Sequence, residues 1–196
     1  MARDSLFLLI ARILGFVLAI VAGVIISRSL GPDLRGVYVL VVTISTFASG
    51  LGNLGLDFSS LYLVSKDRYP VRQVHGLAII AAAVLGVLFL LLYAIFQAPI
   101  HAYVLKDISP TFAFLALGMV PISMYWLICS SIMSGLKRFP LLSFFSLGFS
   151  LGEVTLAFMT LVVFRWGLNG LLGAWALETL ALAAGGLYVT GRQYGV

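Results

Sequence analysis

Long apolar runs alternate with short polar breaks along the whole chain. Each run holds about 20 or more largely apolar residues, enough for a helix rising 1.5 Å per residue to cross the ~30 Å apolar core of a bilayer. The pattern predicts an all-α, polytopic membrane protein whose six transmembrane helices form one bundle. We place the spans at residues 5–29, 36–64, 74–98, 111–135, 140–164 and 168–190.

Polar residues, glycine and proline mark the connections between the spans. The first connection lies within ISRSLGPDLRGVYVL, from Ile26 to Leu40. Proline cannot donate a backbone hydrogen bond and glycine adopts turn conformations, so Gly31-Pro32 should end the first helix. Most connections are short, and consecutive helices are therefore expected to be antiparallel neighbours.

Composition and charge support this class and exclude others. The chain is 62% hydrophobic and 10% charged, whereas a soluble domain is about half apolar and about a quarter charged. The net charge of +5 comes from basic residues scattered at the ends of apolar runs. They form no patch for nucleic acid, so membrane lipids are the expected surroundings. Cys129 is the single cysteine and cannot form an internal disulfide.

The basic residues also predict the topology. Cytoplasmic connections usually carry more Lys and Arg than external ones, which favours cytoplasmic N- and C-termini in the inner membrane. With that orientation the inside set is Arg3, Lys66, Arg68, Arg72, Lys137, Arg138 and Arg192, and the outside set is Arg28, Arg35, Lys106 and Arg165.

Four of the predicted helices carry a stripe of polar and small residues on one face, because residues three or four apart share a face. The third span has no such stripe and is expected to face lipid. The stripes either pack helices together or line a hydrated cavity between spans one, two, five and six. They comprise Arg12, Gly15, Ala19 and Gly23; Thr46, Ser49, Gly50, Asn53, Asp57 and Ser60; Ser143, Ser146, Ser150, Glu153, Ala157 and Thr160; and Gly167, Gly170, Ala174, Glu178, Ala181 and Gly185.

Glu153 and Glu178 are the candidate ion-coupling residues. Each lies near the middle of its span, where an ionised side chain costs roughly 2.5–3.5 kcal/mol. Each therefore needs a proton, a cation, a basic partner or water. One hypothesis is a shared site for a proton or cation; the alternative is a pair of protonated carboxyls that hydrogen-bond between helices.

Arg12, Asn53 and Asp57 are the candidate substrate-binding residues. Arg12 and Asp57 lie on the cytoplasmic side of their span centres, where Arg12 either pairs with Asp57 or snorkels to the interface. The functional alternative is that Arg12 faces the cavity, where its planar donors match phosphate oxygens.

The chain offers no motif for covalent chemistry. His75 and His101 stand alone beside polar connections and are expected at the membrane interface. Because no Cys/His cluster, nucleophile elbow or phosphate-binding loop occurs, we predict no catalytic residue, no metal site, no cofactor and no enzyme activity.

Several stretches resemble polysaccharide and O-antigen flippases of the multidrug/oligosaccharidyl-lipid/polysaccharide superfamily. SRSLGPDLRGVYVLVVTISTFASGLGNLGLDFSSLYLVSKD, from Ser27, is similar to the start of these proteins. SGLKRF, from Ser134, resembles their turn after the fourth span, and WGLNGLLGAWAL, from Trp166, resembles the beginning of the sixth. The matching positions are Arg28, Leu30, Gly31, Pro32, Asp33, Gly36 and Tyr38, followed by Leu54, Gly55 and Leu56.

The resemblance implies transport of lipid-linked oligosaccharide or polysaccharide repeat units by alternating access, with Arg12 contacting the lipid diphosphate. Such flippases have twelve or fourteen spans in two lobes. About six spans imply an N-terminal lobe that works with a second lobe or a second copy as a homodimer. Two alternatives stay open, a small-molecule or drug exporter of the same superfamily and a non-transporting membrane scaffold subunit.

Overall fold

The computed structural model describes residues 2–103 and 109–194, and in these ranges the chain consists of helices joined by short connections, without strands. This confirms the predicted all-α membrane bundle. Lys106 lies outside the described residues, as do the side chains of Arg3 and His101. The helices are α1 (Ala2–Asn53), α2 (Leu56–Ser65), α3 (Val71–Tyr103), α4 (Pro110–Gly118), α5 (Val120–Gly135), α6 (Phe139–Phe158), the π-helix η1 (Met159–Val163) and α7 (Gly167–Tyr194).

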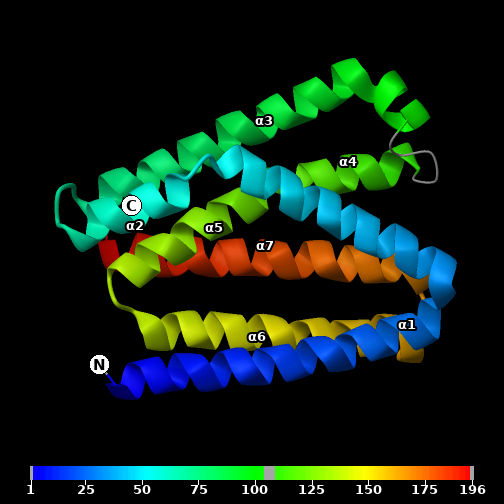
Figure 1. Ribbon diagram of the computed structural model, residues 1–196, viewed down its shortest axis with the longest axis horizontal. Helices are drawn as coiled ribbons and strands as arrows, with labels where there is room; N and C mark the ends of the chain where they lie inside the picture. Colours follow the sequence, from blue (N-terminus) through cyan, green and yellow to red (C-terminus); the bar gives the residue numbers. More distant parts are fainter. Residues whose placement is uncertain (1, 104–108, 195–196) are drawn as a thin grey trace.

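Helix α1 doubles back on itself at Gly31, where the sequence predicts a turn (Figure 1). Gly31 has φ 72° and ψ 177°, and Pro32 follows it. Glycine adopts a positive φ at little cost because it has no Cβ. Five helical segments of the described chain are long and apolar enough to cross a membrane. The first of them, Leu9–Asn53, contains this turn and therefore makes two passes.

Two of the passes are broken where the apolar pattern predicts continuous helices. Leu54 and Gly55 have φ values of 46° and 80°, and this left-handed step separates α1 from α2. The fourth pass is divided between α4 and α5 at Met119. Pro121 follows Met119 by two residues, and its missing N–H and its ring disfavour an uninterrupted helix.

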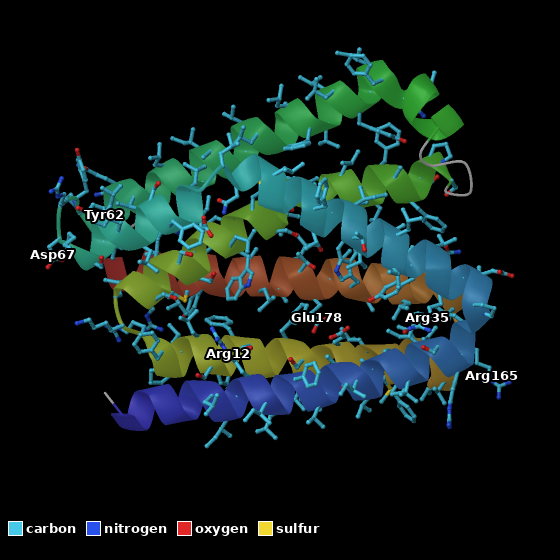
Figure 2. All side chains as sticks on the ribbon, viewed as in Figure 1. Arg12, Arg35, Tyr62, Asp67, Arg165 and Glu178 are labelled. Carbon is cyan, nitrogen blue, oxygen red and sulfur yellow. The ribbon has the colours of Figure 1, made fainter. Side chains whose placement is uncertain are left out.

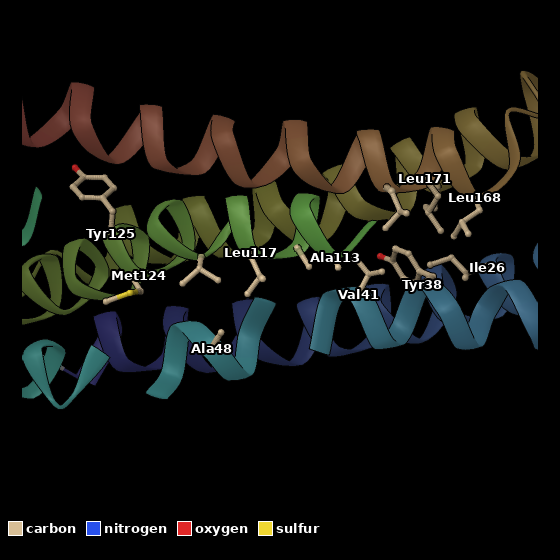
Figure 3. Packing of buried hydrophobic residues seen from close by; sticks show 14 of the residues in the cluster. Ile26, Tyr38, Val41, Ala48, Ala113, Leu117, Met124, Tyr125, Leu168 and Leu171 are labelled. Carbon is tan, nitrogen blue, oxygen red and sulfur yellow. The ribbon is translucent and has the colours of Figure 1, made fainter. Parts of the chain in front are cut away.

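The first half of α1 runs along α6, and α7 lies between this pair and the outer helices α2 and α3 (Figure 1). A core of small and medium side chains fills the space between the second half of α1 and helices α4, α5 and α7. Figure 3 shows this core around Val41, Ala113, Leu117, Met124 and Leu171. One face of α3 is exposed along its length, as expected for a lipid-facing helix, and it carries Leu77, Ile80, Val84, Val87 and Leu91.

His75 is buried in the bundle, close to the start of α3. Its expected place at the level of the membrane interface stays a prediction. Its side chain is fully buried between three helices. Its Nε2 lies 2.7 Å from the hydroxyl of Tyr125 on α5 and 2.9 Å from that of Thr190 on α7. Buried polar groups require partners, and these partners come from helices remote in the sequence. The network ties α3 to the centre of the bundle.

Glycine permits close approach of α3 to α5. A Cβ at Gly86 would collide with the ring of Pro121, whereas a Cβ at Gly76 of the same helix would meet nothing within 4 Å. We expect Gly86→Ala to lower the free energy of unfolding by about 1–3 kcal/mol, because the rigid ring cannot yield. Gly76→Ala is the matched control and should be neutral or slightly stabilising. Thermal unfolding in detergent measures both, and equal melting temperatures would contradict this account of the α3–α5 contact.

Candidate functional site

A polar cavity of about 700 Å³ lies between both passes of α1 and helices α5, α6 and α7. The sequence predicts contributions from the first, second, fifth and sixth passes but misses α5 of the fourth. The signal in α5 was a set of serines at helical spacing. The lining residues are Ala11, Arg12, Tyr38, Val42, Thr46 and Ser49 from α1; Ser123, Trp126, Leu127, Ser130 and Ser134 from α5; Phe139, Leu142, Phe145, Ser146, Phe149 and Glu153 from α6; and Trp175, Glu178, Thr179 and Leu182 from α7.

Several cavity hydroxyls donate their proton to their own helix. The hydroxyl of Thr46 donates to the carbonyl of Val42 at 2.8 Å, and that of Ser134 donates to the carbonyl of Ser130 at 2.9 Å. Thr179 donates to the Trp175 carbonyl at 2.9 Å in the same way. These bonds satisfy the donor of each hydroxyl and leave oxygen lone pairs to accept from a bound molecule. The cavity wall therefore offers hydrogen-bond acceptors.

Glu153 and Glu178 both line the cavity, from facing helices α6 and α7. Both side chains are partly buried. Glu178 projects into the space between α7 and α6 (Figure 2). Its Oε1 is shielded from solvent and has no hydrogen-bond partner among the described residues. The structure therefore brings the two predicted acids to one cavity, and neither forms an ion pair within the described residues.

Gly152 makes room for the Glu178 carboxyl. A Cβ at Gly152 would collide with Oε1 of Glu178, so the carboxyl lies directly against the backbone of α6. Any side chain at this position would push the carboxyl away from α6.

Arg12 lines the same cavity from the first pass, with an exposed side chain (Figure 2). It makes no hydrogen bond or ion pair within the described part of the chain, so the Arg12–Asp57 pair considered from the sequence is not formed there.

The level of Arg12 along the bundle follows from a helix contact. Gly15 of α1 lies against Ser150 of α6, and the first half of α1 runs in the same direction as α6 (Figure 1). Arg12 is therefore about one turn below Ser150 and Glu153 about one turn above it, a separation of about 10 Å along α6.

Asn53 and Asp57 do not line this cavity. They flank the helix break at Leu54 and Gly55, and Asn53 is 6% exposed. The Oδ1 atoms of both residues are buried and have no hydrogen-bond partner among the described residues. Their role in substrate binding stays a prediction.

Residues 1–196 match the family model described as "polysaccharide biosynthesis protein". Neither a curated protein nor a solved structure matches.

The contact between Gly152 and Glu178 can be tested by substitution. In Gly152→Ala the added methyl group should displace the Glu178 carboxyl into the cavity, since the end of this side chain is free to move. We expect faster modification of Glu178 by a carbodiimide, measured by mass spectrometry. Gly148→Ala is the control, because a Cβ there would meet nothing within 4 Å. Equal labelling in the two variants would show that Gly152 does not position Glu178.

Proposed function

Because this chain belongs to the polysaccharide biosynthesis protein family, we propose that it translocates lipid-linked oligosaccharide or polysaccharide repeat units across the inner membrane by alternating access. Family membership and the apolar helices make it a multi-pass membrane protein with a transport or flippase role in polysaccharide synthesis. The substrate, the mechanism and the coupling ion are our proposals.

The chemistry of the polar cavity is the observation that carries the proposal. A volume of about 700 Å³ is within the range of small-ligand pockets. Its wall combines hydroxyl acceptors with the aromatic side chains of Trp126 and Trp175. Sugar rings present hydroxyl donors at their edges and apolar C–H groups on their faces, and the wall matches both.

Arg12 supports a phosphate-bearing head group. Its guanidinium faces the cavity and is not engaged by any described side chain. Planar guanidinium donors bind phosphate oxygens in pairs. In our proposal the lipid diphosphate lies near Arg12, and the sugars extend along the cavity.

Glu153 and Glu178 supply the proposed coupling site. A carboxyl pair in a partly buried cavity binds a proton or a cation more readily than it stays doubly ionised. Transport requires that ligand and ion bind the inward and outward states with different affinity. A proton or cation bound by the two carboxyls would therefore shift the equilibrium between the inward and outward states.

Topology and assembly follow from the arrangement of the ends. The described ends of α1 and α7 lie at one end of the bundle, together with the α2–α3 and α5–α6 connections (Figure 1). Most of the basic residues expected inside lie in those segments, so we propose that this end is cytoplasmic.

Alternating access generally needs two bodies that rock about a shared site, and we propose a second lobe or a second copy as the other body. The proposal requires no covalent step and no cofactor.

One observation favours a second candidate within the same superfamily. The acids Glu153 and Glu178 face the cavity and form no ion pair among the described residues, although Arg12 lines another part of the same cavity. Such an acidic site would also attract an organic cation. A drug exporter is therefore the competing function, and a non-transporting scaffold is the alternative if the chain carries neither substrate.

Substitution of Arg12 tests the proposed head-group site. Arg12→Ala should weaken binding of a radiolabelled polyprenyl diphosphate oligosaccharide in nanodiscs by about 10–100-fold, because a hydrogen bond to a charged group contributes about 1.5–3 kcal/mol. The affinity of Arg12→Lys should lie between those of the wild type and Arg12→Ala, since a lysine cannot bind phosphate oxygens in a paired geometry. Arg192→Ala removes a cation that instead contacts Tyr188 near the end of α7 and serves as control. Unchanged affinity in Arg12→Ala would remove the diphosphate assignment.

The double variant Glu153→Gln, Glu178→Gln tests the coupling site. It should abolish ion-dependent transport of the lipid-linked sugar into liposomes while binding persists, because amides keep the shape but cannot take up a proton. Asp33→Asn removes an exposed carboxyl beside the external turn and is the matched control. Transport at the wild-type rate in the double variant would end the coupling hypothesis. Transport of an organic cation but not of the sugar by the wild-type chain would favour the exporter.

A further inference from the structure

The break between α1 and α2 interrupts the second pass well before the pass ends. Helix α1 ends at Asn53, and α2 begins at Leu56. The left-handed residues Leu54 and Gly55 separate the two helices. Helix α2 then continues for 10 residues to Ser65. At the rise of an α-helix these residues cover about 15 Å, so the break lies inside the bilayer, where polar groups need partners.

Two side-chain oxygens beside the break are shielded from solvent and have no hydrogen-bond partner among the described residues. They are Oδ1 of Asn53, the last residue of α1, and Oδ1 of Asp57, in the first turn of α2. The Asn53 side chain is 6% exposed. A carboxylate in the first turn of a helix can accept hydrogen bonds from the free N–H groups of that turn. Oδ1 of Asp57 does not, so capping of α2 does not account for it.

The end of α1 adds backbone oxygens to this set. The last carbonyls of a helix have no partner within the helix. Those of Gly52 and Asn53, two buried residues, receive no backbone hydrogen bond in the described chain. The C-terminal end of a helix also carries partial negative charge. The break therefore combines carbonyl, amide and carboxylate oxygens over a few residues.

The helices packed against the break bring apolar side chains. A Cβ at Gly52 would collide with the ring of Phe89 on α3 and would press on Sδ of Met124 on α5. Neither neighbour can donate a hydrogen bond to Asn53 or Asp57. A buried oxygen in apolar surroundings is unfavourable unless it is bonded. The surrounding helices leave that requirement unmet within the described part of the chain.

We propose that the α1–α2 break binds a small monovalent cation, for which sodium is the probe. The ligands are Oδ1 of Asn53, Oδ1 of Asp57 and the carbonyls that end α1. Carboxylate, carbonyl and amide oxygens suit hard cations, and interrupted membrane helices hold sodium with unwound carbonyls and helix C-terminal ends. The single carboxylate balances one positive charge, whereas a divalent ion would keep excess charge among apolar side chains.

This site is distinct from the acids of the polar cavity. Neither Asn53 nor Asp57 lines that cavity, whose acids are Glu153 and Glu178. The inference therefore goes beyond the proposed function and does not depend on transport. An ion held by residues of both helices joins the end of α1 to the start of α2, so sodium is expected to stabilise the fold.

Binding of radioactive sodium to the chain in nanodiscs tests the site. In choline chloride at constant ionic strength, a scintillation proximity assay should show saturable binding that unlabelled sodium displaces. Asp57→Asn should weaken this binding by about tenfold or more, because it removes the charged ligand. Asp67→Asn removes an exposed carboxylate from the turn after α2 and is the matched control, which should bind sodium like the wild type.

Asn53→Leu separates ion binding from packing. An apolar side chain of similar size replaces an oxygen that has no partner among the described residues, so the melting temperature in choline should be unchanged or higher. Sodium should raise the melting temperature of the wild type and leave that of Asn53→Leu unchanged. Equal sodium-induced shifts in the two proteins would show that Asn53 is not a ligand and would overturn the assignment.

The double variant Glu153→Gln, Glu178→Gln shows which acids hold the ion. Sodium binding that persists in this variant and is weakened in Asp57→Asn supports the break. Loss of binding in the double variant alone would assign the ion to the cavity acids and overturn this inference, while the proposed coupling site would stand. Absence of saturable sodium binding by the wild type, or equal affinity in Asp57→Asn and Asp67→Asn, also overturns it. Failure of the wild type to transport a lipid-linked sugar would overturn only the proposed function.

Discussion

The cost of leaving polar groups against hydrocarbon governs the arrangement of this bundle. Backbone groups satisfy that constraint within each helix, but side chains such as Arg12, Glu153 and Glu178 need water or partners. The helices meet the requirement by turning their polar faces toward one cavity. The exposed face of α3, by contrast, carries many large apolar side chains.

The same cost also requires close contact between helices. The helices that surround the cavity must touch one another along the rest of their length to keep the cavity separate from the lipid. Glycine allows that contact at several points. Gly15 lies on Ser150, Gly86 on Pro121, and Gly135 on the backbone carbonyl of Leu61. These contacts join α1 to α6, α3 to α5 and α2 to α5, and they are spread around the bundle rather than gathered at one interface.

Much of this architecture could be predicted from the sequence. Hydrophobic periodicity and the positions of glycine, proline and polar residues between the apolar runs are local properties. The turn at Gly31 and the polar faces containing Arg12, Glu153 and Glu178 were readable in this way. The family resemblance from Arg28 onward is confirmed by the family match.

What the sequence could not supply was the identity of the neighbours across each interface. The burial of His75 depends on Tyr125 and Thr190, which are 50 and 115 residues away in sequence. The break between α1 and α2 uses a left-handed Leu54, a conformation that the residue type disfavours. Helices α6 and α7 leave open space at Gly148, although the spacing of Gly148 and Gly152 would ordinarily predict tight packing.

The distribution of charge within the cavity bears on how a substrate would lie there. Arg12 and the acids Glu153 and Glu178 are separated by about two turns of α6. A diphosphate placed among the carboxyls would meet like charge in a poorly screened site, so only the Arg12 end suits it. A single orientation of a diphosphate sugar therefore satisfies two constraints at once, with the phosphates at Arg12 and the sugars along the hydroxyl-lined wall. An organic cation would use only the acidic end and would leave Arg12 without a role.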